Sequence, residues 1–264
     1  MTTRRGIFLA PFDALADPRL VGDLAAEAEA AGWDGVFVWD HLQYGERISE
    51  VADVWACCAA IAMRTERVLL GPMVTPLARR RPQVLARQAA SLATMSGGRL
   101  VLGLGLGDDW VGEFSAFGDE PDPRVRGRML DEGLAVLTSL LGGEHTDHAG
   151  EHYTARGVTF RPSPRVPIWL AGRFGNAAPL RRASAYDGFF VIDLAGAEDL
   201  DRVRADLEAH SVAPDFDVVV DLRDGQDPGP WLDRGASWVL DRIGPYDLDL
   251  ADVRRRIAAG PSVT

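Results

Sequence analysis

The 264-residue chain contains no lysine, and arginine supplies all 28 of its basic residues. Without a side-chain amine the protein cannot form a Schiff base with a carbonyl substrate or with pyridoxal phosphate. A P-loop nucleotide site is excluded as well, because that motif needs its lysine. These absences remove Schiff-base aldolases, pyridoxal phosphate enzymes and P-loop ATPases from the candidate classes.

The chain also lacks an excess of positive charge, and it contains no long apolar run. Its 39 acidic residues outnumber the arginines and leave a net charge of −11, which repels nucleic acids and anionic membranes. No apolar run approaches the roughly 20 residues of a membrane helix. The first apolar run is closed by Pro11 and is too short for a signal-peptide core. We therefore predict a cytoplasmic protein that binds neither nucleic acid nor membrane.

Cysteine is scarce, and the two cysteines, Cys57 and Cys58, are adjacent in an apolar stretch. Neighbouring cysteines cannot easily meet disulfide geometry, which disfavours a structural bridge. We interpret both as small buried hydrophobic residues rather than as a redox pair.

What the chain does contain is an alternation of short apolar runs with longer segments of helical apolar spacing. The runs predicted to be strands are 7–10, 35–39, 68–74, 100–105, 167–171, 189–192, 217–220 and 238–240. The segments predicted to be helices are 20–31, 54–63, 82–95, 124–141, 176–185, 197–210, 230–234 and 248–259.

These runs lack polar alternation, which indicates a parallel sheet buried on both faces. Eight strand–helix units in about 250 residues predict a (β/α)₈ TIM barrel, here a single domain over residues 1–264. A doubly wound open sheet is the alternative. The longest irregular stretch, 142–166, is a candidate for a small hairpin.

In a TIM barrel the active site lies at the C-terminal ends of the strands. Asp40 and His41 follow the second predicted strand. A histidine at the barrel mouth suits proton transfer or hydrogen bonding to a cofactor ring. The alternative is that His41 caps the next helix or is satisfied within the rim.

Two glycine-containing segments, 105–107 and 172–175, join a strand to a helix, and the second contains Arg173. Glycines let the backbone approach a phosphate closely, and arginine adds a charge-assisted contact. The other interpretation is that these glycines only make tight turns. Trp110, in the loop after the fourth strand, is placed to cover a ring.

Two charged clusters each allow two readings. The arginines at 79–81 would either attract an anionic group or form a solvated helix entrance. Three histidines and three carboxylates lie in residues 144–152, but their spacing fits no standard zinc pattern, so solvated turn residues are the preferred reading.

Taken together, the chain resembles the luciferase-like monooxygenase family, which includes the F420-dependent reductases and dehydrogenases. The stretches that carry the resemblance are 30–41, 70–77 with 81–82, 89–99, 102–105, 161–164, 167–172, 187–188, 235–238 and 260–261. They cover nearly the whole chain in a specific order.

The resemblance implies roles for individual residues. Asp40 and His41 would lie beside the isoalloxazine or deazaflavin ring, with His41 as the acid/base or substrate-orienting group. A non-proline cis peptide near Met73 and Val74 would form a bulge that supports the ring. The other residues implied to bind the cofactor are Thr75, Gly105, Gly107, Asp108, Ala171, Gly172 and Arg173, with the last three on its phosphate. Many relatives carry a second glycine where this chain has Arg173-Phe174.

The resemblance also implies an oxidoreductase that acts on a small organic substrate. With FMN, the reduced ring would react with oxygen; with F420, hydride would pass between the deazaflavin and a substrate carbon. The Asp40-His41 pair and the arginine-only composition favour F420 over FMN. A reductase would supply reduced cofactor, and dimers are common in such a family.

Two alternative functions remain open. One is a non-catalytic paralogue that binds flavin. The other is a metal-dependent TIM-barrel hydrolase, whose ligands at the strand ends would be Asp40, His41, Asp193, Asp221 and Asp241. That set lacks the paired histidines typical of such sites.

Overall fold

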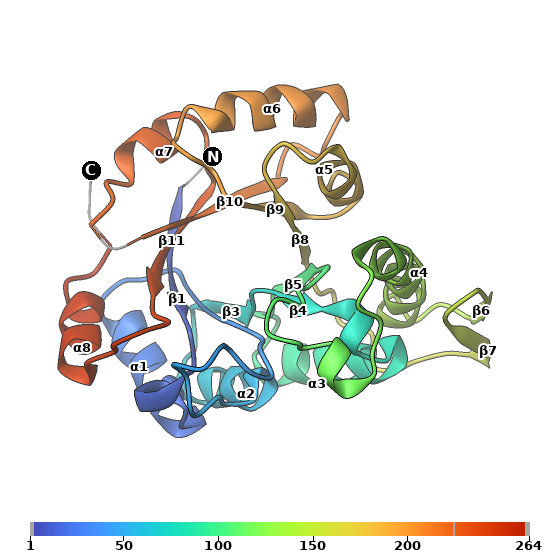
Figure 1. Cartoon of the computed structure of the whole chain (residues 1–264), viewed down its shortest axis with the longest axis horizontal. Coiled ribbons are helices and arrows are strands. Elements are labelled where there is room, and N and C mark those ends of the chain that lie inside the picture. The colour runs from blue at the N-terminus through green and yellow to red at the C-terminus, as the bar shows by residue number, and fades with distance from the viewer. Residues whose placement is uncertain (1–2, 224, 262–264) are drawn as a thin grey trace.

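Nine strand segments in the described part of the chain form one parallel sheet that curls into a barrel in the computed structural model (Figure 1). The structure describes residues 3–223 and 225–261. The strands are β1 (Arg4–Leu9), β2 (Gly35–Val38), β3 (Leu69–Pro72), β4 (Thr75–Pro76), β5 (Leu102–Gly105), β8 (Ile168–Arg173), β9 (Gly188–Ile192), β10 (Asp217–Leu222) and β11 (Trp238–Ile243).

The sheet runs in the order β3-β2-β1-β11-β10-β9-β8-β5-β4, so β3 and β4 are its two ends. They are also consecutive in the chain, separated only by the cis peptide Met73–Val74. A parallel bridge joins Leu70 of β3 to Leu100, two residues before β5, and brings the two sides of the curled sheet together. β3 and β4 are thus two halves of one barrel strand. The predicted (β/α)₈ barrel and the predicted cis peptide are confirmed, and the open-sheet alternative is wrong.

Helices cover the outside of the barrel (Figure 1). They are α1 (Pro18–Ala30), α2 (Val54–Arg64), α3 (Pro82–Met95), α4 (Pro123–Leu141), α5 (Ala177–Ala183), α6 (Asp199–Ala209), α7 (Gly229–Asp233) and α8 (Leu250–Ala258), with the short 3₁₀ helices η1 (Asp13–Leu15), η2 (Leu77–Arg79) and η3 (Ser115–Phe117). Proline starts α1, α3 and α4, where a missing N–H costs no helical bond.

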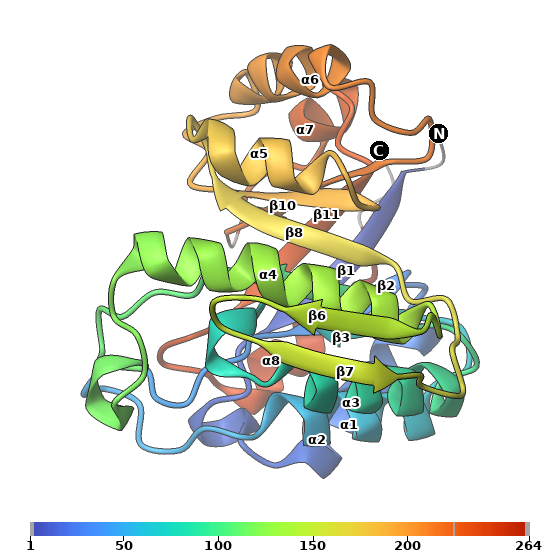
Figure 2. The ribbon, with the colours of Figure 1, turned by 90° about the vertical axis from the view of Figure 1, so that its right-hand side faces the viewer.

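The predicted hairpin is confirmed as well. β6 (Thr146–Ala149) and β7 (Thr154–Val158) pair antiparallel and lie outside the barrel along α4 (Figure 2). Glu132 of α4 accepts hydrogen bonds from His148 and from the backbone N–H groups of His152 and Tyr153. The histidine-rich tract therefore attaches this hairpin to α4.

The inside of the barrel is filled by aromatic side chains. Phe37, Trp169 and Trp238 contact one another with ring centroids 5.4 to 5.7 Å apart. Phe8 and Phe190 pack edge to face above them at 5.7 Å. Because these rings occupy the lower barrel, a ligand is restricted to the mouth at the C-terminal strand ends.

We expect Gly172→Ala to destabilise the fold. A Cβ at this position would lie 2.2 Å from Cβ of Pro179 in α5, and overpacking of this kind costs about 1–3 kcal/mol. The matched control is Gly127→Ala in α4, where a Cβ meets no described atom within 4 Å and alanine favours the helix by about 0.5–1 kcal/mol. Urea unfolding of both variants measures the difference, and equal stabilities would contradict the packing described here.

Candidate active site

Asp40 lies directly after β2 with its carboxylate buried and fully engaged. Its Oδ2 accepts a hydrogen bond of 2.7 Å from Oγ1 of Thr75 in β4. Its Oδ1 accepts one of 2.7 Å from Nη2 of Arg79. Arg80 adds a contact of 2.9 Å to Oδ2. Both oxygens thus face protein donors, which gives Asp40 a positioning role in this arrangement.

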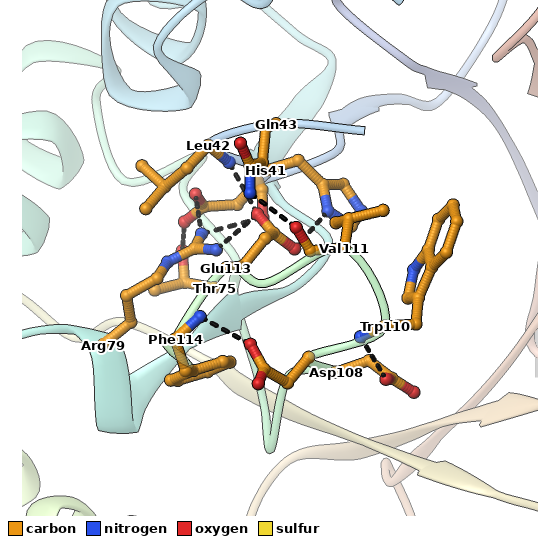
Figure 3. A network of polar contacts seen from close by, with 12 residues as sticks. His41, Leu42, Gln43, Thr75, Arg79, Asp108, Trp110, Val111, Glu113 and Phe114 are labelled. Carbon is orange, nitrogen blue, oxygen red and sulfur yellow. Dashed lines mark hydrogen bonds and ion pairs between the residues drawn. The ribbon is translucent and has the colours of Figure 1, made fainter. Parts of the chain in front are cut away.

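Glu113, in the loop after β5, is the second buried carboxylate. It accepts hydrogen bonds from Nδ1 of His41 (2.8 Å), the backbone N–H of Leu42 (2.6 Å) and Nη1 of Arg79 (2.7 Å). Figure 3 shows the Arg79 guanidinium and the His41 ring converging on it. The side chains of Arg79, Asp40 and Glu113 are only 4%, 3% and 2% exposed. A single arginine therefore bridges two carboxylates inside the protein.

The charge state of Glu113 determines which nitrogen of His41 carries a proton. Burial raises the pKa of Glu113, but the hydrogen bond and charge of His41, the Leu42 N–H and the charge of Arg79 together lower it below its usual value. An ionised carboxylate can only accept hydrogen bonds, so Nδ1 of His41 is the donor. In neutral His41, Nε2 is then the unprotonated nitrogen, available to accept a proton.

An aromatic wall surrounds the His41 ring at the mouth. The ring centroids of Tyr44, Trp39 and Phe12 lie 4.8, 5.8 and 6.0 Å from that of His41. Trp110 extends the wall by packing on Tyr44 at 5.3 Å, and most of its indole is exposed. His41 itself stays 24% exposed. The site therefore presents one accessible histidine within an apolar, π-rich surface.

Small residues line the mouth along the next three barrel strands. A Cβ on Gly105 would lie 2.7 Å from Cγ2 of Val74 and 3.7 Å from Cβ of Ala171, so these three residues converge. Gly107 has φ +71°, and a Cβ there would come within 2.8 Å of Phe114 and Pro76. This narrow apolar floor, free of bulky side chains, fits a planar ring stacked beside His41.

The predicted phosphate residues lie further along the rim. Arg173 pairs with Asp108 at 3.0 Å and also with Asp193. Gly172 and Arg173 belong to β8, which runs two residues beyond the predicted end, and Gly172 faces Pro179 of α5 rather than the mouth. The cofactor roles of Asp108, Gly172 and Arg173 stay predictions, and a phosphate at Arg173 would share it with two carboxylates.

Other charged candidates are placed differently from the sequence readings. The solvated reading is wrong for Arg79 and Arg80, because the two side chains point inward at Asp40. It fits Arg81, which is exposed directly before α3, and attraction of an external anion stays a prediction. Asp241 faces out of the barrel and pairs with Arg5. Within residues 3–223 and 225–261 no group of three His, Cys, Asp or Glu side chains is arranged to hold a metal ion.

Glu113 is the site residue that sequence reasoning missed. It stands in the same loop as Gly107 and Trp110, between Gly112 and the buried Phe114. The signal that the sequence offered was an acidic residue next to an aromatic residue, shortly after the end of a predicted strand. Its partner His41 lies 72 residues away, so the pairing itself could not be read from spacing.

These features define a barrel enzyme class in which a histidine–carboxylate pair stands beside a floor for a planar ring. The chain belongs to the luciferase-like monooxygenase family, whose model matches residues 4–223. This confirms the family resemblance seen in the sequence.

Relatives and solved structures agree with this membership. F420-dependent glucose-6-phosphate dehydrogenase of Nakamurella multipartita is 36% identical over 180 residues, covering 66% of this chain and 52% of its own. The F420-dependent glucose-6-phosphate dehydrogenase of Gordonia bronchialis is 30% identical, covering 82% of this chain and 67% of its own. The chain thus spans about half to two thirds of these relatives. The structure of an F420-dependent secondary alcohol dehydrogenase with an F420-acetone adduct has a TM-score of 0.80 at 18% identity, covering 96% of both chains.

We expect Glu113→Gln to destabilise the protein at neutral pH by about 3–5 kcal/mol, because it leaves two arginines, Arg79 and Arg80, facing the single carboxylate of Asp40 in the interior. The folded-state pKa of Glu113 is lowered from 4.5, so its stabilisation is complete above that value and is lost as the pH falls through the folded pKa. Denaturant unfolding from pH 7 to pH 3 should show the wild type and the variant converging at the acid end. A gap that stays constant with pH would contradict this role.

Proposed function

We propose that the protein is an F420-dependent dehydrogenase that oxidises a hydroxyl group on a small organic substrate. The observation that carries the proposal is the His41–Glu113 pair: a partly exposed imidazole whose Nδ1–H is held by an ionised, buried carboxylate. This arrangement leaves Nε2 as a base at the barrel mouth. The names of the F420-dependent relatives support the choice of cofactor.

His41 takes the proton of the substrate hydroxyl on Nε2 while the carbon of that group loses a hydride. F420, when bound, would supply the acceptor for that hydride. The imidazolium that forms on His41 is stabilised by Glu113, and Arg79 keeps that carboxylate in place. Asp40 holds Arg79 from the other side and itself accepts a hydrogen bond from Thr75, so both residues act on His41 indirectly.

The ring would rest against Met73, Val74 and Gly105, with Ala171 at its far edge. Gly107 and Asp108 would lie toward the ribityl chain, and Arg173 would approach the phosphate. Thr75 is fully buried and would act through its hydrogen bond to Asp40, and the α-carbon of Gly172 faces Pro179 of α5. The aromatic wall of Trp39, Tyr44 and Trp110 would line the opposite side of the site.

Because oxidation of the substrate would leave F420 reduced, turnover would require a second enzyme that consumes reduced F420. The predicted reductase would be needed if the reaction ran toward reduction of the substrate. A homodimer in the cytoplasm remains the expected setting. No helix in the described part of the chain has the length and apolarity needed to cross a bilayer.

His41→Ala should bind F420 as the wild type does and lose turnover by about 10²–10⁴-fold, the usual contribution of a positioned acid or base. His210→Ala is the matched control, because His210 is an exposed histidine at the C-terminal end of α6, in the outer helical layer of the barrel. Steady-state F420 reduction measures kcat, and cofactor fluorescence measures binding. Unchanged turnover in the His41 variant would sink the assignment.

Titration of the purified protein with F420 and with FMN, each oxidised and reduced, tests the cofactor. We expect saturable quenching by F420 and weaker or no response to FMN. Binding of reduced FMN alone would instead indicate a monooxygenase. F420 binding without hydride exchange would indicate the non-catalytic paralogue. Binding of neither, together with metal-dependent hydrolysis, would favour the hydrolase alternative.

A further inference from the structure

A continuous aromatic surface runs from His41 outward to the rim of the barrel mouth. The ring centroid of Tyr44 lies 4.8 Å from that of His41. On its outer side Tyr44 packs against Trp110 at 5.3 Å and against Tyr246 at 6.0 Å. Trp110 is 58% exposed and Tyr246 is 37% exposed. Tyr44, Trp110 and Tyr246 thus form an outer wall that joins the proposed base to solvent.

The loop that carries Trp110 is held by hydrogen bonds within itself and to the neighbouring loop. The carboxylate of Asp109 accepts a bond of 2.7 Å from the backbone N–H of Phe114. The side-chain amide of Gln43 donates one of 2.5 Å to the backbone oxygen of Val111. Figure 3 shows the Trp110 indole standing clear of this polar network. A flat apolar side chain that is fixed and exposed favours a ligand that covers it, because apolar area leaves water and little side-chain entropy is lost.

The outer wall and the floor proposed for the cofactor ring lie on different sides of the mouth. Tyr44 follows β2 and Tyr246 follows β11, the second and eighth strands of the barrel, which flank β1 in the sheet. Val74 and Gly105 of the floor belong to the third and fourth barrel strands. Trp110 joins the wall from the loop after β5. The outer wall therefore stays open to a substrate while a cofactor ring occupies the floor.

Two arginines lie beside the aromatic surface, and both are paired with carboxylates. The guanidinium carbon of Arg47 lies 4.5 Å from the ring centroid of Tyr246, and Arg47 pairs with Asp247 at 2.8 Å. Arg242 pairs with Asp221. Charges that are already paired attract an anionic ligand little, and the net charge of −11 repels it. The outer wall therefore favours an uncharged ligand.

We infer that the substrate is an uncharged alcohol whose hydroxyl-bearing carbon is attached to an aromatic or other flat apolar group, and that this group binds the outer wall. The inference rests on the proposed function, which places the reacting carbon beside Nε2 of His41. Aromatic rings pack edge to face or offset at centroid separations of about 4.5–7 Å. Because Tyr44 contacts His41, a ring packed on Tyr44 and Trp110 brings its attached carbon to the imidazole. The sugar phosphate in the names of the relatives is a different class of substrate.

Binding of acetophenone, the ketone that oxidation of α-methylbenzyl alcohol gives, tests the surface without turnover. Thermal stabilisation of the protein compares it with para-acetylbenzoate, which adds only a carboxylate. The wild type should bind acetophenone more tightly, and Trp110→Ala should weaken that binding about 3–10-fold, the value of one aromatic contact. Phe117→Ala is the matched control, because Phe117 is a 60% exposed aromatic residue of the same loop, in η3. Tighter binding of para-acetylbenzoate, no saturable binding of acetophenone, or equal binding by the two variants would overturn the inference.

Steady-state reduction of F420 gives the functional readout with α-methylbenzyl alcohol and isopropanol, which differ by a phenyl ring in place of a methyl group. The wild type should have the higher kcat/KM for the aromatic alcohol. Trp110→Ala should narrow that preference by raising the KM of the aromatic alcohol with little change in kcat. Loss of kcat for both alcohols alike, with their ratio unchanged, would indicate a structural role and count against the inference.

F420 titration of Trp110→Ala separates a substrate wall from a cofactor wall. An unchanged cofactor affinity is expected, and weaker F420 binding would assign Trp110 to the cofactor and contradict the substrate reading. If the wild type binds acetophenone through Trp110 but neither binds nor reduces F420, the proposed function fails while the apolar binding surface stands. If F420 is reduced by an alcohol while acetophenone does not bind, the inference fails and the proposed function stands.

Discussion

The two hydrogen bonds that Arg79 donates in different directions, Nη1 to Glu113 and Nη2 to Asp40, are the constraint on which the site depends. Two buried carboxylates would repel each other and resist desolvation without a cation between them. Arg80 brings a second positive charge to Asp40, so the charges balance. His41 then acquires its tautomer and orientation from Glu113. The orientation and tautomer of His41 thus depend on buried ion pairs between residues that need not contact a substrate.

The same network ties together three strand ends of the barrel. Asp40 follows β2, Thr75 and Arg79 come from β4 and η2, and Glu113 lies in the loop after β5. The interruption of the third barrel strand matters here, because β4 pairs with β5 at Thr75–Leu104 while the Thr75 hydroxyl reaches back to Asp40. Val74, at the interruption, packs over Gly105. The floor for a planar ring and the support of His41 are therefore neighbouring parts of one local structure.

Local apolar patterns were sufficient to predict the barrel, because most strands and helices are short and bounded by proline, glycine or a capping aspartate. For example, α3 occupies the predicted residues 82–95. Pairing between distant segments was not predictable in this way. β8 extends to Arg173 because Arg173 pairs with Ile192 of β9. The sequence allows Arg79 and Arg80 to be solvated. They lie in the interior because they pair with the carboxylates of Asp40 and Glu113, which are distant in the chain. Asp241 is different, because strand alternation after the buried Leu240 already places it outside the barrel.

The absence of lysine takes on a physical meaning in this setting. An ammonium is a compact charge, whereas a guanidinium offers donors along two edges. Arg79 uses this geometry to bridge two carboxylates, and Arg242 uses it to engage Asp221 through Nε and Nη2. In a chain with a net charge of −11, both arginines are held inside the barrel by acidic partners, and Arg79 is almost wholly buried between its two carboxylates.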